Sequence, residues 1–307
     1  MSLLARASSA LTGCGTGQVP AAPLFARAGF LSRLVHEALL VEVHLTPKPG
    51  LVDLRNNGAH SDMNVATFET SAAAIAPFFE QFFMAGVASD TLPATDALPE
   101  LRRLGLKAET AMLRATDGVN THKGAIFAFG LALGAAGRLT AKGAALETGA
   151  LCDEVAAIAA GIVARDFDGT TRTASTAGEY IYRRYGMRGA RGEAESGFAT
   201  VRDIGLAAFR AARAQGAGEE TSLLAALAAL LAQNSDTNLI ARGGPEATEY
   251  VRREARVIAE LGATDCDFVA RLEALDDALI ARNLSPGGTA DLVGLTWFFA
   301  RLESAGV

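Results

Sequence analysis

The chain has 307 residues, of which 50% are hydrophobic and only 7% are aromatic. This length and composition exclude a disordered chain, suffice for one large core, and favour packed helices over sheets because Ala and Leu dominate. The net charge of −6 excludes a general electrostatic attraction to nucleic acid or acidic lipid, so a polyanionic ligand would need a local basic cluster. Cys14, Cys152 and Cys266 form no CxxC pair, which argues against a disulfide framework and a thiolate zinc site.

The first 28 residues, rich in Gly, Ala and Ser, are predicted to form a disordered tail. Residues 11–14 read LTGC and look like the lipid-attachment box of a lipoprotein. No continuous apolar stretch precedes that box, so a lipoprotein signal is disfavoured. Residues 29–307 are then expected to form a single helical domain.

Helical periodicity recurs along the rest of the chain. The apolar run at 124–137 is shorter than the ~20 residues that span a bilayer, which predicts a buried helix in a cytoplasmic protein without membrane contact. No alternating strand pair with a two-residue turn is present, so the predicted fold class is all-α, as a single compact multi-helix domain. Helices are predicted near 30–45, 64–86, 99–116, 121–138, 141–165, 174–185, 198–214, 220–233, 245–261, 264–282 and 288–303.

Irregular polar segments interrupt these helices. Polar groups gathered at helix ends in an otherwise apolar helical body are typical of a site, so we expect the site to be built from these loops. The segments are 45–62, 117–123, 166–173, 186–197 and 234–244, with a short Gly-rich segment at 284–289.

The stretch DGVNTHKGAIF at 117–127 is predicted to be a turn that leads into a helix. Asn120 or Thr121 can cap that helix. The free N–H groups of its first turn would then point outward beside His122 and Lys123, an arrangement that suits a phosphate group. The segment does not match the GxxxxGK[ST] phosphate loop, and an ordinary capped helix is the alternative interpretation.

The stretch YRRYGMRGARGEAESGF at 182–198 combines arginines with glycines in an acidic protein. Guanidinium groups offer paired donors to phosphate oxygens, and glycines let backbone N–H groups approach a ligand closely. The glutamates of the same loop favour a site that also needs a carboxylate or a metal ion, while a solvated basic loop is the alternative. These residues are Arg183, Arg184, Arg188, Arg191, Glu193 and Glu195.

The stretch NSDTNLIARGG at 234–244 places Asp236 and Asn238 at the start of a helix. Their oxygen atoms can ligate Mg²⁺ or orient a ribose hydroxyl, while a capping motif is the alternative. His36 and His44 lie eight positions apart and do not form an HExxH motif, so a zinc hydrolase is disfavoured.

Taken together, five ordered motifs resemble those of the triphosphoribosyl-dephospho-coenzyme A synthase family. The resemblance covers about residues 30–305 and leaves the N-terminal tail outside. The motifs are EVHLTPKPGLVDLRNNGAHSDM, GVNTHKGAIF, AGEYIYRRYGMRGARGEAESGF, SDTNLIARGG and SPGGTADLVGLTWF.

The resemblance implies that residues 29–307 form a catalytic domain that transfers the 5-triphosphoribosyl group of ATP to the 2′-hydroxyl of 3′-dephospho-coenzyme A and releases adenine. Mg²⁺ would accompany ATP. The product would pass to a phosphoribosyl-dephospho-coenzyme A transferase, which acts on the acyl-carrier subunit of malonate decarboxylase or citrate lyase. No nucleic acid or membrane partner is expected, and a homodimer is the expectation from base rates. A non-catalytic assembly partner that binds dephospho-coenzyme A or the acyl-carrier subunit is the alternative.

The implied chemistry needs a carboxylate to deprotonate the attacking hydroxyl, and groups that hold phosphates. Asp53 is predicted to be the general base or a metal ligand, with Glu42, Asp62 and Glu193 as rivals for the catalytic role. The predicted metal ligands are Asp53, Asp62 and Asp236. The predicted substrate-binding residues are Lys48, Asn56, Asn57, His60, Asn120, Thr121, His122, Lys123, Arg183, Arg188, Arg191, Asn238 and Arg242.

Overall fold

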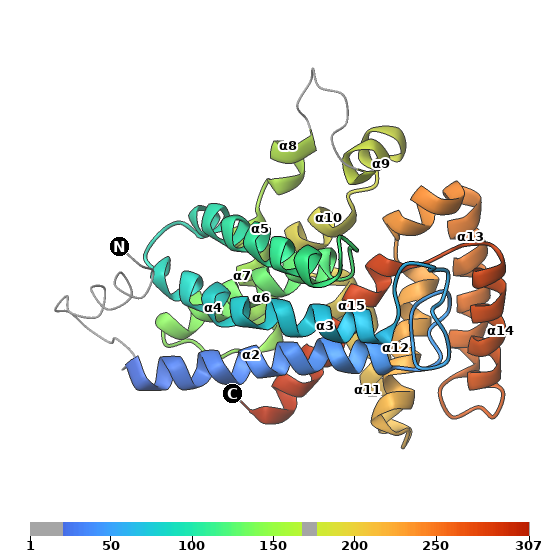
Figure 1. Ribbon diagram of the computed structural model, residues 1–307. Helices are drawn as coiled ribbons and strands as arrows, with labels where there is room; N and C mark the ends of the chain where they lie inside the picture. The colour runs from blue at the N-terminus through green and yellow to red at the C-terminus, as the bar shows by residue number, and fades with distance from the viewer. Residues whose placement is uncertain (1–20, 168–176, 307) are drawn as a thin grey trace.

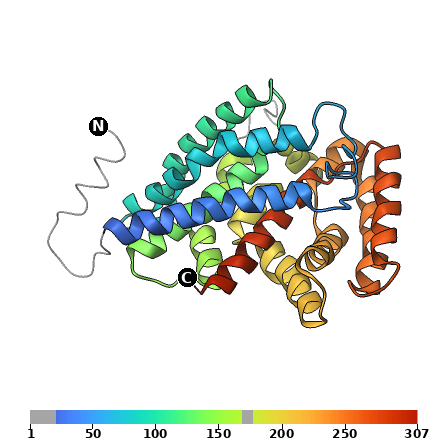
Figure 2. The same cartoon turned by 60° about the horizontal axis from the view of Figure 1, so that its bottom comes forward.

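The computed structural model of the protein describes residues 21–167 and 177–306. Within these residues every regular element is a helix, so the predicted all-α fold is confirmed (Figure 1). Helix α2 (Ala21–His44) lies along one face of the molecule, and α15 (Gly287–Ala305) lies beside it (Figure 2). Residues 21–28 belong to α2, so the helix begins before the predicted end of the tail at residue 28, while residues 1–20 lie outside the described residues.

The centre of the core is α6 (Lys123–Ala141), a helix that is apolar on all sides. It packs against α4 (Phe79–Ala88) at very short range, because a Cβ atom on Gly86 would lie only 2.0 Å from the carbonyl oxygen of Gly134. Close helix contact of this kind requires glycine at the crossing point. The apolar 124–137 run is therefore a buried core helix, as predicted.

Two stretches are long and apolar enough to cross a membrane by length and composition alone. They are Lys123–Ala141, which is α6, and Val65–Ala88, which covers three consecutive helices. In Lys123–Ala141, 83% of the most apolar window is buried inside the protein. Burial against other helices accounts for the apolar character of α6.

Several predicted helices are divided in the structure. The 64–86 helix is split by Pro77, which lies in the short 3-10 helix η1 (Ala76–Phe78) between α3 (Val65–Ile75) and α4. A proline inside a helix removes an N–H donor and clashes with the preceding turn, which explains the break. The 141–165 helix is split at Gly161, whose φ of +72° lies in the left-handed region, into α7 (Thr148–Ala159) and α8 (Ile162–Phe167).

The C-terminal half differs from prediction at two places. The segment 186–197, expected to be a loop, contains the short helix α10 (Gly189–Glu195). Helix α13 (Thr237–Leu261) begins before the predicted start at 245 and is kinked at Gly244, with φ +70° and ψ −171°, directly before Pro245. The remaining elements are η2 (Ala94–Ala97), α5 (Leu98–Ala115), α9 (Ala177–Tyr185), the π-helix η3 (Val201–Gly205), α11 (Leu206–Ala214), α12 (Glu219–Gln233) and α14 (Phe268–Ala281).

The long polar loop 45–64, between α2 and α3, lies beside α13 and α14 at one end of the molecule (Figure 1). Asp276 of α14, fully buried, holds the loop in place. Its carboxylate accepts hydrogen bonds from the backbone N–H of Gly50 at 2.9 Å and from the side chains of Arg55 at 2.6 Å and Asn56 at 2.7 Å. A charge-assisted cluster of this kind fixes an otherwise irregular segment.

Candidate active site

A cavity of about 750 Å³ lies where the polar loops meet. Its lining comes from the end of α2, the loop 45–64, α10, and the first turns of α6, α13 and α15. This volume lies within the range of about 300–1,000 Å³ usual for small-molecule sites. The segments that line the cavity are far apart in sequence.

Three helices of eight residues or more begin at the cavity wall. The lining includes residues 123–125 of α6, Thr237 and Asn238 of α13, and Gly287 and Gly288 of α15. The N-terminal end of a helix carries a partial positive charge and free N–H groups. Three such ends around one cavity make it favourable for anionic groups.

Four cationic side chains line the same cavity: Lys48, Lys123, Arg188 and Arg242. Arg188 is the least constrained of them, because its side chain is 66% exposed and its nearest carboxylate, on Glu195, lies 3.9 Å away. Lys123 is paired with Glu109 at 2.6 Å. Arg242 donates to the carbonyl oxygen of Ala59 at 2.8 Å and thereby also braces the loop 45–64.

The floor of the cavity is charged although it is buried. Glu42 of α2 forms an ion pair with Lys48, and both side chains are more than nine-tenths buried. Burying two charges is costly, so such a pair is retained only where both groups are well satisfied or where function needs them. Both residues were predicted as site residues, and the structure brings them together.

His122 lies on the same floor and is neutral. Burial, followed by the charges of Lys48 and His36, lowers the pKa of His122 to about 3. Its Nδ1 is hydrogen-bonded to the hydroxyl of Ser71 at 2.7 Å, which in turn accepts from Thr121 at 2.6 Å. Its Nε2 is buried and has no hydrogen-bond partner among the described residues.

Asp291 of α15 is a cavity residue that the sequence did not single out. Its side chain is partly buried at the cavity wall, and burial, followed by the charges of Glu42 and Asp236, raises its pKa well above the ordinary value. It accepts a hydrogen bond from the backbone N–H of Ala125 in the first turn of α6. In the sequence, Asp291 is the single acid in the apolar run TADLVGLTWFF. A helix that served only the hydrophobic core would not need a charged residue there, and this could have marked Asp291 as a site residue.

Glu193, His60 and Asp62 were also predicted, and each lines the cavity with a partner of its own. Glu193 accepts hydrogen bonds from the hydroxyl and the backbone N–H of Thr200, and burial raises its pKa. His60 is hydrogen-bonded to the hydroxyl of Ser285 at 2.8 Å, and burial, followed by the charge of Arg242, lowers its pKa. Asp62 lies at the rim, with its side chain 60% exposed and an oxygen 3.7 Å from Nδ1 of His60.

Asp53 is not among the residues that line the cavity. It is only 2% exposed, and its carboxylate accepts the backbone N–H groups of Lys48 at 2.8 Å, Arg55 at 2.8 Å and Asn56 at 3.0 Å. These three hydrogen bonds hold the turn of its own loop. The structure therefore gives Asp53 a place in folding the loop, in contrast to the predicted role as general base.

Four predicted substrate-binding residues also lie outside the cavity lining. Asn56 is held by Asp276, and Asn57 is exposed on the same loop. Arg183 pairs with Glu179 one turn away on α9. Arg191 binds Asp166 at 2.6 Å, and its guanidinium carbon lies 4.7 Å from the centre of the Phe167 ring, so its charge is neutralised by a structural contact.

The predicted metal ligands are not brought together. Asp236 caps α13 through the N–H of Asn238 at 2.8 Å, and it also accepts the N–H and the hydroxyl of Thr289 at 2.7 and 2.9 Å. Both of its oxygens are therefore used, as are those of Asp53, while Asp62 is exposed. These residues do not fit a shared ion.

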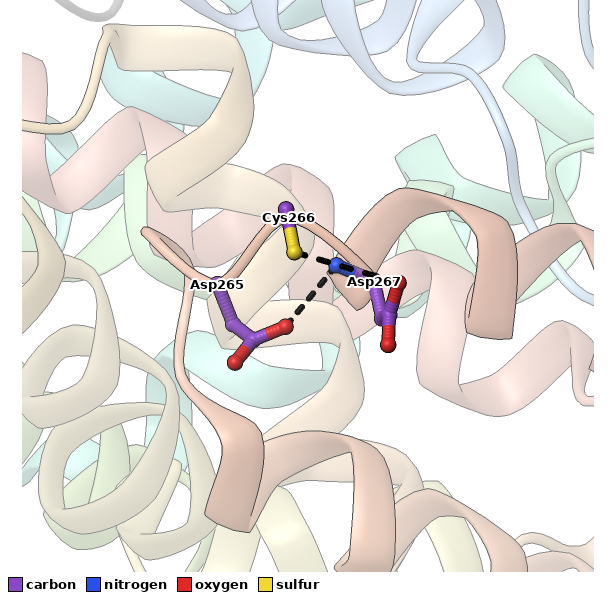
Figure 3. Close-up of side chains that lie close together, drawn as sticks. All are labelled: Asp265, Cys266 and Asp267. Atoms are coloured by element: carbon purple, nitrogen blue, oxygen red, sulfur yellow. Dashed lines mark hydrogen bonds between the residues drawn. The ribbon is translucent and has the colours of Figure 1, made fainter.

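Among the described residues, the group that is close enough to share a metal ion lies elsewhere, in the turn between α13 and α14. Figure 3 shows its members, Asp265, Cys266 and Asp267, all of them exposed. The backbone N–H of Asp267 donates to Asp265 at 2.8 Å, which is an ordinary side-chain turn at a helix start. The turn geometry accounts for the cluster without a metal.

An all-helical fold with a cavity that gathers cationic side chains, helix N-termini and carboxyl groups is typical of a protein that acts on phosphorylated small molecules. Residues 28–307 match the model of the CitG family, described as ATP:dephospho-CoA triphosphoribosyl transferase. No solved structure matches the chain significantly.

Named relatives cover most of the chain. A Salmonella gallinarum protein named probable 2-(5''-triphosphoribosyl)-3'-dephosphocoenzyme-A synthase is 48% identical over 90% of this chain and 92% of its own length. The Pectobacterium atrosepticum 2-(5''-triphosphoribosyl)-3'-dephosphocoenzyme-A synthase is 49% identical over 87% of each chain. The chain therefore belongs to the ATP:dephospho-CoA triphosphoribosyl transferase family and is a transferase, which confirms the resemblance found in its motifs.

Proposed function

We propose that the cavity binds ATP and 3′-dephospho-coenzyme A and transfers the 5-triphosphoribosyl group to the 2′-hydroxyl of the second substrate, with release of adenine. The observation that supports this best is the meeting of three helix N-termini and four cationic side chains around one cavity. ATP brings a triphosphate and dephospho-coenzyme A a pyrophosphate, and both need such surroundings. A family of transferases is consistent with catalysis and disfavours the alternative of a non-catalytic assembly partner.

The exposure of the cationic side chains indicates which of them can bind phosphate. Lys123, Arg188 and Arg242 lie toward the open side, where they can bind phosphate oxygens. The helix starts add N–H donors that need no side chain. Because the sequence has no GxxxxGK[ST] loop, nothing indicates that the phosphoanhydride bonds are activated, which suits a reaction that leaves the triphosphate intact.

Glu42 is our candidate for the base that accepts the proton of the attacking hydroxyl. It is a carboxyl group on the floor of the cavity, where a base for the hydroxyl of a bound substrate would have to lie, and it forms an ion pair with Lys48. Glu193 and Asp62 line the cavity as well and are the rivals that mutagenesis has to separate. Mg²⁺ would enter as part of the ATP complex, because the predicted carboxylate ligands do not fit a shared ion.

The product is proposed to serve as the precursor of the prosthetic group of malonate decarboxylase or citrate lyase. A phosphoribosyl-dephospho-coenzyme A transferase would attach it to the acyl-carrier subunit. A cytoplasmic location would fit this role, and a homodimer is the proposed assembly. Genes for decarboxylase or lyase subunits beside the gene for this chain would decide between the two pathways.

A chromatographic assay tests the function. The protein is incubated with MgATP and 3′-dephospho-coenzyme A, and adenine and the coupled product are quantified, with Glu42→Gln as the comparison. We expect adenine and product in equal amounts, no ADP, AMP, phosphate or pyrophosphate, and no adenine without dephospho-coenzyme A. Release of ADP or phosphate in step with product would refute ribosyl transfer.

A further inference from the structure

Two carboxyl groups from helices far apart in sequence meet on the cavity floor. Glu42 comes from the end of α2 and Asp291 from the first turns of α15, and both line the cavity. Gly294 lies one turn after Asp291 on the same side of α15, and an added Cβ there would be 3.8 Å from the Cβ of Glu42. The two acids are therefore neighbours in one cavity.

Their surroundings differ in charge. Glu42 has the ammonium group of Lys48 as its partner. Asp291 forms no ion pair with any described residue and accepts only the N–H of Ala125. The charged groups that face it, Glu42 and Asp236, are both acidic, and together with burial they raise the pKa of Asp291 well above the ordinary value. One carboxyl thus has a cationic partner while the other has only acidic neighbours, and such a difference in surroundings is the pattern of an acid–base pair.

The chain makes room for Asp291 at one specific point. An added Cβ on Gly124, in the first turn of α6, would lie 1.9 Å from Oδ2 of Asp291. Any residue other than glycine would push the carboxyl group away from its place between α6 and Glu42. Gly124 itself lines the cavity. The carboxyl group of Asp291 therefore reaches the cavity surface through the space that a side chain at position 124 would fill.

His122 gives an independent sign that a polar ligand group belongs here. It lines the same cavity with 3% exposure, and its Nε2 has no hydrogen-bond partner among the described residues. A buried nitrogen without a hydrogen bond is unfavourable, and a bound ligand with a polar atom would satisfy it. A purine base, with ring nitrogens and an amino group, offers such atoms.

We propose that Asp291 is the catalytic acid that protonates the departing adenine, while Glu42 accepts the proton of the attacking hydroxyl. This inference rests on the proposed ribosyl transfer. The bond between C1″ and N9 of adenine breaks, and its electron pair goes to the base, which takes a proton from Asp291 and leaves neutral. The bond between C1″ and the 2′-oxygen of dephospho-coenzyme A forms, and the hydroxyl proton goes to Glu42. The enzyme returns to its starting state when solvent moves one proton from Glu42 to Asp291.

The first test replaces each acid by its amide. We expect Asp291→Asn to lower kcat with ATP by about 10²-fold or more, the usual size of a general acid–base effect, with the Kd of ATP changed less than about threefold. Asp267→Asn, an exposed acid outside the cavity lining, is the control for loss of a carboxylate. An Asp291→Asn enzyme with kcat within about threefold of wild type would overturn the proposal, while wild-type protein that releases no adenine would instead refute the function on which it rests.

The second test separates an acid from a structural residue through the leaving group. A ribose 5-triphosphate with β-4-nitrophenol in place of adenine needs no proton, because nitrophenolate is already a stable anion. Asp291→Asn should therefore process this analogue within about fivefold of wild type, while Glu42→Gln should lose activity with both substrates. Equal loss of activity by Asp291→Asn on both substrates would overturn the proposal.

Gly124→Ala provides a readout that needs no analogue. The added methyl group displaces the carboxyl of Asp291, so we expect a similar fall in kcat with ATP, and little further fall when Asp291→Asn is added. Thermal unfolding confirms that each variant is folded. Fully additive effects of the two substitutions on kcat, or a Gly124→Ala enzyme of normal activity, would overturn the placement of the acid.

Discussion

Arg188 and Arg191 offer a matched pair of substitutions, because they lie three positions apart and only one of them lines the cavity. Arg188 has a 66% exposed side chain and only a distant carboxylate neighbour at 3.9 Å, so its guanidinium is available to a phosphate. Arg191 is already held by Asp166 and the ring of Phe167. We expect Arg188→Ala to weaken ATP binding and Arg191→Ala to leave it unchanged.

The magnitudes follow from the two environments. A charge-assisted hydrogen bond contributes about 1.5–3 kcal/mol, and the lower end applies to Arg188 because water screens an exposed group. Loss of about 1.5 kcal/mol corresponds to a roughly tenfold higher Kd for ATP. Arg191→Ala instead removes an ion pair of 2.6 Å and a cation–π contact of 4.7 Å. This should cost about 1–2 kcal/mol of unfolding free energy, or a few degrees of melting temperature.

The assay measures the Kd of MgATP by isothermal titration calorimetry and the melting temperature of each variant in the absence of nucleotide. Arg188→Ala should raise the Kd and leave the melting temperature unchanged. Arg191→Ala should lower the melting temperature and leave the Kd unchanged. A tenfold higher Kd in Arg191→Ala, with Arg188→Ala unaffected, would mean that the arginine-rich segment binds phosphate through the residue that the structure turns away from the cavity.

Three further predictions concern the loop, the buried histidine and the nucleotide. Asp53→Asn should lower the free energy of unfolding by about 1–3 kcal/mol in urea titrations, because an amide cannot accept all of the backbone N–H groups that the carboxylate accepts; unchanged stability would contradict this. Burial, followed by the charges of Lys48 and His36, lowers the pKa of His122 from 6.5 to about 3. Between pH 6.5 and about pH 3, His122 is therefore protonated in the unfolded chain and neutral in the folded chain. The free energy of unfolding should fall as the pH is lowered through this range, by up to about 1.4 kcal/mol per pH unit. The His122→Gln variant should lack this slope. A β,γ-methylene analogue of ATP should serve as substrate with release of adenine, since its altered bridge lies far from C1″; competitive binding without adenine would refute ribosyl transfer.

The fold class could be predicted because helical periodicity and turn residues are local signals. Helix ends were less predictable where a proline or glycine inside a periodic run breaks the helix, as at Pro77 and Gly161. The short helix α10 was missed because its glycines and arginines have the composition of a loop. Arg191 of this helix pairs with Asp166, 25 residues earlier, and no local pattern records such a contact.

The candidate site was predicted at the level of motifs more than of single residues. Glu42, Lys48 and His122 were expected in the site and line the cavity. Asp53 was expected there because it is a carboxylate in an unusual loop, yet that loop needs a carboxylate for its own backbone. The sequence can show that a polar residue is unusual at its position. Whether that residue stabilises the fold or binds a ligand depends on which groups its polar atoms contact, and only the structure shows this. Asp291 was missed because a single acid in an apolar helix is a weak signal beside a loop full of polar residues.

The unusual residues of one motif are explained by the residues of another. Gly50 is required because an added Cβ would lie 2.3 Å from the carbonyl oxygen of Leu284, and Gly124 because Asp291 fills the space of its side chain. Each glycine therefore belongs to a contact between segments that are far apart in the sequence. Loss of activity on changing a glycine of this kind consequently says little about ligand contact by that residue itself. The informative experiment changes both members of a contact, and a cavity carboxyl such as Asp291 is recognised as catalytic only when its effect depends on the leaving group.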